Sequence, residues 1–185
     1  MESTLRQLNI SQLPGAFEDY PTPELQQIDS DNWNCGMDVK AGFRIAYDPV
    51  YKNSCVEFFV SFENGFYYNL EFNCIGTILG AYEKGREDRI PLEKDLLGSI
   101  QTIPSLGRGR IRIEDRETLW TLDVKIPITI FKYSDPESFH NKKAFGNFYK
   151  CGDEQVVPHY LSWARITTEN PGFHRPEYFG EVKFA

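Results

Sequence analysis

Amides and a carboxylate alternate along one run of this sequence, another carboxylate lies in the neighbouring run, and these side chains are the ones best suited to chemistry. Glu57 lies in SCVEFFVSF, and Glu71 and Asn73 lie in FYYNLEFNC, with ENG between the two runs. An amide both donates and accepts hydrogen bonds, whereas a carboxylate only accepts them. This mixture suits a polyhydroxylated ligand, because each hydroxyl group both donates and accepts. The alternative is a sheet face that is merely polar.

The ENG segment predicts the register of a β-hairpin. A three-residue loop, residues 63–65, with Gly65 in the left-handed conformation pairs Phe58 with Leu70. The same register places Glu57 roughly opposite Glu71 on the other face, whereas a two-residue turn would mix polar and apolar side chains. Because side chains alternate strictly along a strand, we expect one apolar face and one solvated polar face.

Opposed carboxylates also suggest the acid pair of a glycoside hydrolase. Directly cross-strand residues have Cβ atoms about 4.5–5.5 Å apart, and a retaining enzyme needs carboxyl groups about 5 Å apart. Almost any cross-strand pair satisfies this distance. Binding without cleavage is therefore the first hypothesis, and hydrolysis by Glu57 and Glu71 is the second. An interaction domain without a small ligand is the third.

Other catalytic and metal-binding signatures are missing from the sequence. There is no serine nucleophile motif, P-loop or dinucleotide-binding glycine pattern. Neither the histidines nor the cysteines have the spacing of metal ligands, and no CxxC pair predicts a zinc or thioredoxin-type site. These residues are His140, His159, His174, Cys35, Cys55, Cys74 and Cys151.

Composition and charge narrow the classes of partner. The chain has 185 residues, a net charge of −7 and an aromatic content of 15%. Nucleic-acid binders usually carry a basic surface, so we expect no nucleic-acid partner. The densest basic stretch places Arg108, Arg110 and Arg112 at alternating positions of a predicted strand, which indicates one solvated strand face.

Two further expectations concern membranes and location. No apolar run approaches the ~20 residues that span a bilayer, so no membrane partner is expected. The N-terminal residues have neither a basic start nor an apolar core, so they do not resemble a signal peptide. A cytoplasmic location follows, although a secreted protein that had lost its leader would look the same.

Short runs rich in β-branched and aromatic residues, separated by Gly, Asn, Asp and Pro, predict an all-β protein. We expect an antiparallel β-sandwich that spans residues 38–185. Residues 1–37 are polar and are predicted to form an extended segment that packs on this domain. Only PLEKDLLGSI and PITIF have the pattern of short helical turns.

Five motifs then carry a family resemblance: SCVEFF, YNLEFNCIGTILGAY, NFYKCGD, PHYLSW and FHRPEYFG. In this order they resemble the family 9-like carbohydrate-binding domains, relatives of the family 9 carbohydrate-binding modules of xylanases. The resemblance covers roughly residues 38–184. It implies a jelly-roll-like antiparallel β-sandwich that binds a mono- or oligosaccharide without cleaving it, in bacterial polysaccharide catabolism.

The resemblance also implies site residues. Two aromatic side chains sandwich the terminal sugar in the xylanase modules, and Tyr51 and Phe173 match these two walls. The hydroxyl partners would be Glu57, Glu71, Asn73 and Asn170, although the modules carry an arginine where this chain has Glu71. FHRPEYFG would then be the second wall of the slot. It could instead be an aromatic cover over the last strand. The aromatic residues expected in the core are Trp120, Tyr160, Trp163 and Phe179.

The chain departs from the family in two further respects. Both wall positions hold rings smaller than the tryptophans of the modules. A strand and loop of some tens of residues that family members carry between the FRIAY and DPVYKNS motifs is missing between Tyr47 and Asp48. The modules also hold structural calcium, which is a possible cofactor, but no Asp-rich loop identifies a calcium site here.

Overall fold

The computed structural model describes residues 55–63, 65–109, 120–134, 143–152, 159–170 and 172–184, together with the backbone of two short strands nearer the N-terminus. Several predictions fall outside these residues. They are the wall at Tyr51, the junction of Tyr47 and Asp48, the boundary at residue 37, and the residues Cys35, Arg110, Arg112 and His140.

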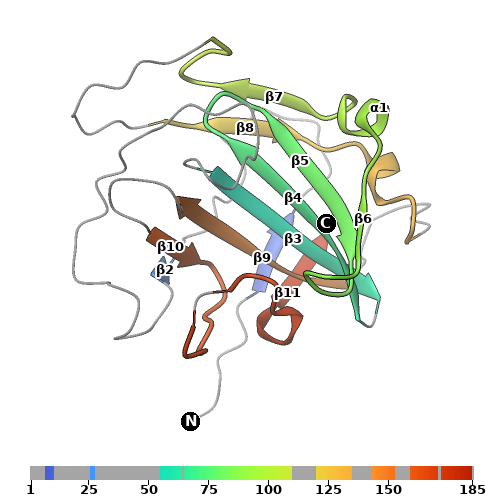
Figure 1. Ribbon diagram of the computed structural model, residues 1–185, viewed down its shortest axis with the longest axis vertical. Coiled ribbons are helices and arrows are strands. Elements are labelled where there is room, and N and C mark those ends of the chain that lie inside the picture. The colour runs from blue at the N-terminus through green and yellow to red at the C-terminus, as the bar shows by residue number, and fades with distance from the viewer. Residues whose placement is uncertain are drawn as a thin grey trace.

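One large sheet dominates the fold (Figure 1), in the order β1-β11-β9-β3-β4-β5-β6 with β10 beside β9 and β2 beside β10. All pairs in it are antiparallel except β1 with β11. Its strands are β1 (Gln7–Ile10), β2 (Gln26–Gln27), β3 (Cys55–Glu63), β4 (Phe66–Asn73), β5 (Ile78–Glu83), β6 (Arg89–Pro91), β9 (Lys143–Gly152), β10 (His159–Ser162) and β11 (Gly180–Phe184).

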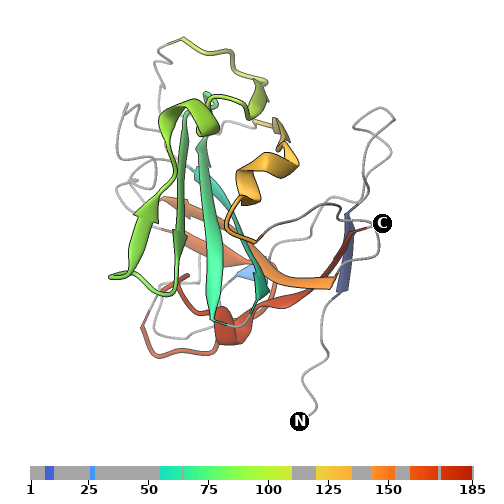
Figure 2. The same cartoon turned by 90° about the vertical axis from the view of Figure 1, so that its right-hand side faces the viewer.

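A second, two-stranded sheet lies against one face of the large sheet (Figures 1 and 2). It consists of β7 (Gln101–Pro104) and β8 (Leu122–Lys125). Short helices accompany it: α1 (Lys94–Leu97) and η3 (Ile128–Phe131), with η4 (Pro176–Tyr178) near the C-terminus. The expected helical turns in PLEKDLLGSI and PITIF are therefore confirmed, and so is the all-β sandwich architecture.

The predicted pairing of β3 with β4 is confirmed, but its loop was predicted incorrectly. Phe58 pairs with Leu70, and Glu57 pairs with Glu71. Gly65 has a φ of 94°, in the left-handed region where glycine is preferred. However, Glu63 pairs with Phe66, and the one-residue offset arises from an irregularity between Val60 and Glu63. A bulge in β3 thus supplies the extra residue that the sequence analysis assigned to the turn.

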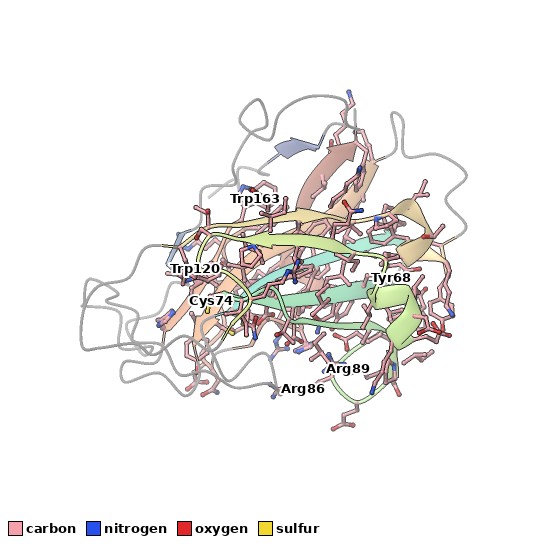
Figure 3. All side chains as sticks on the ribbon, turned by 90° about the horizontal axis from the view of Figure 1, so that it is seen from above. Tyr68, Cys74, Arg86, Arg89, Trp120 and Trp163 are labelled. Atoms are coloured by element: carbon pink, nitrogen blue, oxygen red, sulfur yellow. The ribbon has the colours of Figure 1, made fainter. Side chains whose placement is uncertain are left out.

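The main hydrophobic core lies between the large sheet and the layer formed by β7, β8, α1 and η3. It is built from alternate residues of β3 and β4, whose other residues face the opposite side. Its buried members are Phe58, Val60, Tyr68, Leu70, Phe72, Leu92, Ile100, Ile130, Phe131, Ala144, Trp163, Ala164, Val182 and Phe184. Figure 3 shows the side chains of this packed interior, with Tyr68 and Trp163 labelled.

The second face of the sheet is also buried, which corrects the expectation of a solvated polar face. Asn69 is 0% exposed, Glu71 is 3% exposed and Glu57 is 5% exposed. Ile166, Phe173 and Phe179 join residues of β3, β4 and β9 in a second cluster on this side. A hairpin pattern shows which side chains share a face, but it does not show what later covers that face.

Arg108 is not in a strand, contrary to the prediction for the basic stretch. It lies in a bend after β7, and its guanidinium donates to the Thr102 carbonyl and, at 3.0 Å, to the Thr102 hydroxyl. In the described ranges of the chain, no helix has both the length and the apolar character needed to cross a membrane.

Candidate functional site

A group of polar side chains lies on the second face of the sheet, and we call it the polar layer. It consists of Asn69 and Glu71 on β4, Glu83 at the end of β5, Arg89 at the start of β6, and His174 in the segment before η4. Asn69 and Glu71 share a face because they are two residues apart. Glu83 and Arg89 are direct cross-strand partners in the β5–β6 hairpin.

Arg89 joins the two carboxylates of the polar layer. Its Nη2 donates to Glu71 Oε1 at 3.3 Å, and its Nε lies 3.5 Å from Glu83 Oε2. Asn69 Nδ2 donates to Glu71 Oε1 at 3.0 Å and to Glu83 Oε1 at 3.4 Å. One guanidinium thus neutralises part of the charge of two buried carboxylates (Arg89 is labelled in Figure 3).

His174 connects the C-terminal segment to the same layer. Its Nδ1 lies 2.7 Å from Glu83 Oε1 and 3.0 Å from the Tyr67 hydroxyl. A carboxylate only accepts hydrogen bonds, so Nδ1 carries the proton that it donates to Glu83. Burial, followed by the nearby Glu83 carboxylate, raises the pKa of Tyr67, so this hydroxyl stays protonated and donates to Glu83 rather than to His174 Nδ1.

Among the described residues, three buried acceptor atoms of the polar layer have no hydrogen-bond partner: Asn69 Oδ1, Glu71 Oε2 and Glu83 Oε2, the last of which lies 3.5 Å from Arg89 Nε. Burial raises the pKa of Glu71 above its ordinary value, although Arg89 and Asn69 act in the opposite direction. A buried polar atom without a partner costs about 1–3 kcal/mol. The layer therefore offers acceptors that a ligand with hydroxyl donors would satisfy.

Glu57 and Glu71 are directly opposed, as predicted, but they have different neighbours. Glu71 contacts Arg89 and Asn69, whereas Glu57 Oε1 lies 3.3 Å from Cys55 Sγ and 3.1 Å from Cys151 Sγ. The cysteine thiols donate to the carboxylate. The two carboxylates thus belong to two separate groups on the same face.

The pairing of Cys55 with Cys151 is a feature that the sequence analysis missed. The residues face each other across β3 and β9, and their Sγ atoms are 2.7 Å apart. Their separation of 96 positions in the chain leaves no local signal. In the part of the chain that the structure describes, these cysteines and Glu57 are the one group of three potential metal ligands, with ligand atoms within 4.8 Å of one another.

Asn73 stabilises a turn of the backbone. Its Oδ1 accepts from the Ile75 N–H at 3.2 Å and from the Thr77 N–H at 2.9 Å. Gly76 completes this β4–β5 connection with a φ of 80°. Asn73 is 2% exposed, so its carbonyl oxygen is committed to the turn. A sugar contact of Asn73 would have to come from its Nδ2.

Phe173 packs over the second cluster. Its ring lies 4.2 Å from that of Tyr149 at an interplanar angle of 10°, and 8% of the residue is exposed. The Tyr149 hydroxyl also donates to the Phe173 carbonyl at 3.1 Å. Through Phe173, FHRPEYFG therefore packs on β9 and covers this part of the sheet. Asn170, three residues earlier, is exposed, and its carbonyl accepts from the Thr168 hydroxyl at 2.8 Å.

Four other aromatic residues, Trp120, Tyr160, Trp163 and Phe179, were predicted to lie in the core, and two of them are buried there. Trp163 is 4% exposed in the main core, and Phe179 is 7% exposed in the second cluster. Tyr160 is half-buried and packs against the second cluster. Trp120 is also half-buried (Figure 3).

Sequence reasoning placed Asn69 on the polar face without naming it as a site residue, and it missed the roles of Glu83, Arg89 and His174. The hairpin signal in YEKGREDR could have revealed one pair, because a five-residue loop places Glu83 opposite Arg89. The pairing of β4 with β5 then brings Glu83 beside Tyr67. His174 arrives from a segment 91 positions away from Glu83, so no local pattern predicts its contact.

Comparison with known proteins supports this assignment of the fold. The sequence model of carbohydrate-binding family 9 matches residues 24–184. The chain is similar to the crystal structure of a protein from Bacteroides uniformis that is proposed to bind carbohydrate. The TM-score is 0.79 and the identity 28%, over 98% of this chain and 100% of the other. A search of curated proteins found no match. The family match spans most of the sequence and every strand of the described sheet except β1, and the chain therefore belongs to carbohydrate-binding family 9.

Proposed function

We propose that this protein binds a mono- or oligosaccharide on the second face of the large sheet and does not cleave it. Membership of a carbohydrate-binding family supports the class of ligand. The observation that carries the proposal is the pair of buried acceptors, Asn69 Oδ1 and Glu71 Oε2, for which the described part of the chain provides no hydrogen-bond partner. Sugar hydroxyl groups are donors of the kind that these two atoms lack.

Arg89 is the donor of the proposed site. Its side chain is 30% exposed, whereas that of Glu71 is 4% exposed, so the guanidinium borders the solvent beside the buried carboxylate. A hydroxyl group could accept from Arg89 and donate to Glu71. The family modules carry an arginine at the position of Glu71, and Arg89 brings a guanidinium within 3.3 Å of that residue from a neighbouring strand.

The aromatic walls remain part of the proposal, with Tyr51 and Phe173 on either side of the sugar. An aromatic ring can stack on the C–H face of a pyranose, while polar groups at the rim fix its orientation. Asn170 is exposed and suits such a rim. Because only 8% of Phe173 is exposed, we assign the larger share of binding to Arg89 and Glu71.

Binding without cleavage is favoured over hydrolysis by the surroundings of the two carboxylates. A retaining hydrolase needs both carboxyl groups free to reach one glycosidic bond. Here Glu71 is held by Arg89, and Glu57 accepts from two thiols. Turnover of a glycan that disappears in Glu57→Gln would instead favour the hydrolase.

Calorimetry on ligands first identified with a glycan array tests the proposal. Arg89→Gln should weaken binding by about 10–100-fold, because hydrogen bonds to a charged group contribute about 1.5–3 kcal/mol. Arg86→Gln is the matched control: it removes the same charge from an exposed residue of the same hairpin and should leave affinity unchanged (Figure 3).

Circular dichroism would show that both variants are folded. Equal affinities of the two variants would contradict the role of Arg89. A folded protein that binds no sugar at millimolar concentration would overturn the proposal in favour of an interaction domain.

A further inference from the structure

A buried carboxylate lies between two buried thiols at one end of the β3–β9 ladder. Cys55 is 0% exposed, Cys151 is 2% exposed and Glu57 is 5% exposed. Cys55 and Glu57 share a face because they are two residues apart on β3, and Cys151 is the direct partner of Cys55 on β9. The three side chains therefore converge on one point from two adjacent strands.

The arrangement of these three side chains is more specific than the burial of single cysteines. A free cysteine behaves as a small hydrophobic residue, and many are buried for that reason alone. Here Glu57 directs one oxygen at two sulfur atoms, at 3.3 Å and 3.1 Å, so three potential ligand atoms meet at one point. The Lys150 ammonium also interacts electrostatically with all three groups.

From this geometry we propose that Cys55, Glu57 and Cys151 bind a thiophilic divalent metal ion of the zinc class. The site is distinct from the proposed sugar site, because its ligand atoms are not those of Arg89, Asn69 or Glu71. Thiolate sulfur prefers soft and borderline ions, and a carboxylate oxygen completes many zinc sites. Calcium does not fit, since it takes six or more oxygen ligands.

Binding requires a small rearrangement and a release of protons. Zinc–sulfur bonds of about 2.3 Å at tetrahedral angles place two sulfur ligands about 3.8 Å apart. The Sγ atoms, now 2.7 Å apart, would separate by about 1 Å through side-chain rotation. Each thiol loses one proton to solvent, so one ion replaces two protons and binds two thiolates and one carboxylate. A fourth position remains for another ligand or water.

Oxidation of the two thiols to a disulfide is the competing outcome, and Glu57 argues against it. A disulfide has no S–H groups, so Glu57 Oε1 would lose both thiol donors and face two sulfur atoms instead. A metal ion keeps that oxygen engaged as a ligand.

Cobalt titration of the reduced, metal-free protein tests the site. One equivalent of Co²⁺ should produce a sulfur-to-cobalt charge-transfer band, and Zn²⁺ should remove the band by displacement. Zn²⁺ should also protect two thiols of the wild-type protein from a thiol reagent. This measurement on the unaltered chain does not depend on whether any variant folds.

Variants then assign the ligands. Cys55→Ala and Cys151→Ala should abolish the band, and Glu57→Gln should weaken Zn²⁺ binding by at least about tenfold. Cys74→Ala is the matched control, because Cys74 is buried but is not one of the three ligands, and it should bind normally.

Three results would overturn the proposal: no band and no thiol protection in the wild-type protein, a band that persists in Cys55→Ala, or a Cys55–Cys151 disulfide in a protein that takes up no metal after reduction. Sugar binding is a separate readout. Loss of metal uptake with intact glycan affinity would reject the metal site alone.

Discussion

At the scale of single residues, the chemistry of each carboxylate depends on its neighbours. Glu57 and Glu71 are paired across the same two strands, yet one accepts from thiols and the other from a guanidinium. Both are buried, so a charge on either has to be stabilised by contacts within the protein. The protonation of Glu71 should therefore affect the stability of the fold.

Glu71→Gln tests this coupling through the pH dependence of stability. Burial raises the pKa of Glu71 in the folded protein above the ordinary value of 4.5. The folded state then binds more protons than the unfolded state between these two pKa values, so the Glu71 contribution to stability falls as pH rises through that window. The Glu71→Gln variant should lack this decrease in stability. Urea unfolding at pH values from 4.5 upward would measure the free energy of unfolding of both proteins.

The exposed Glu87 provides a control for this experiment, because Glu87→Gln makes the same chemical change outside the polar layer. Its pH profile should parallel that of the wild-type protein. A constant difference in unfolding free energy between wild type and Glu71→Gln across the pH range would show that the two states have the same Glu71 pKa.

Phe173→Ala should show how much the packing of the Phe173 ring on Tyr149 contributes to stability. The substitution removes a ring stacked 4.2 Å from Tyr149, and truncation of a buried Phe costs about 3–5 kcal/mol. Phe145→Ala, at a position that is 50% exposed, should cost about 1 kcal/mol or less. Chemical denaturation measures both. Similar costs for the two variants would mean that Phe173 does not hold the segment on the sheet.

At the scale of elements, β9 organises the large sheet. One edge pairs with β3 from Ser61 back to Cys55, while the other edge is shared, with β11 beside its first half and β10 beside its second. Gly146 lies where β9 contacts β3 and β11, opposite Val60 and Gly180. The position requires glycine because the backbone of β3 passes close to it.

Gly146→Ala should therefore destabilise the protein. An added Cβ would lie 2.5 Å from the Phe59 carbonyl oxygen, and neither backbone can move without disturbing the ladder. Such overpacking costs about 1–3 kcal/mol. Gly85→Ala is the control, since nothing lies within 4 Å of its added Cβ. Thermal unfolding of both variants tests this prediction. Equal melting temperatures would contradict the close approach of the β3 backbone to Gly146.

At the scale of the whole molecule, the large sheet is packed on both faces. The main core lies under β7, β8 and the short helices, and the C-terminal segment covers the polar face (Figure 2). His174 and Phe173 fasten that segment through Glu83 and Tyr149. A ligand that binds the polar layer would thus add contacts to a surface built from several distant parts of the chain.

Sugar binding should consequently raise the melting temperature. A ligand at 100 times its dissociation constant adds about 2.7 kcal/mol to the stability of the native state. For a protein of this size each kcal/mol raises the melting temperature by about 2–4 °C, so a rise of about 5–10 °C is expected. Arg89→Gln should show a smaller rise at the same sugar concentration. A rise that Arg89→Gln retains in full would place the ligand elsewhere.

The sequence by itself determined the class of fold and the register of the β3–β4 hairpin. Alternation of side chains is a local property, so the pairs of Phe58 with Leu70 and of Glu57 with Glu71 could be predicted. The bulge before Glu63 could not, because a third loop residue and an irregularity in the strand place the same side chains opposite each other.

Only the tertiary structure decided what surrounds these side chains. Burial of Glu71, its contact with Arg89, the approach of His174 and the meeting of Cys55 with Cys151 all depend on which segments lie side by side. These contacts join residues as much as 96 positions apart. A local pattern shows which side chains point the same way, whereas strand order and the path of the C-terminal segment determine what they meet.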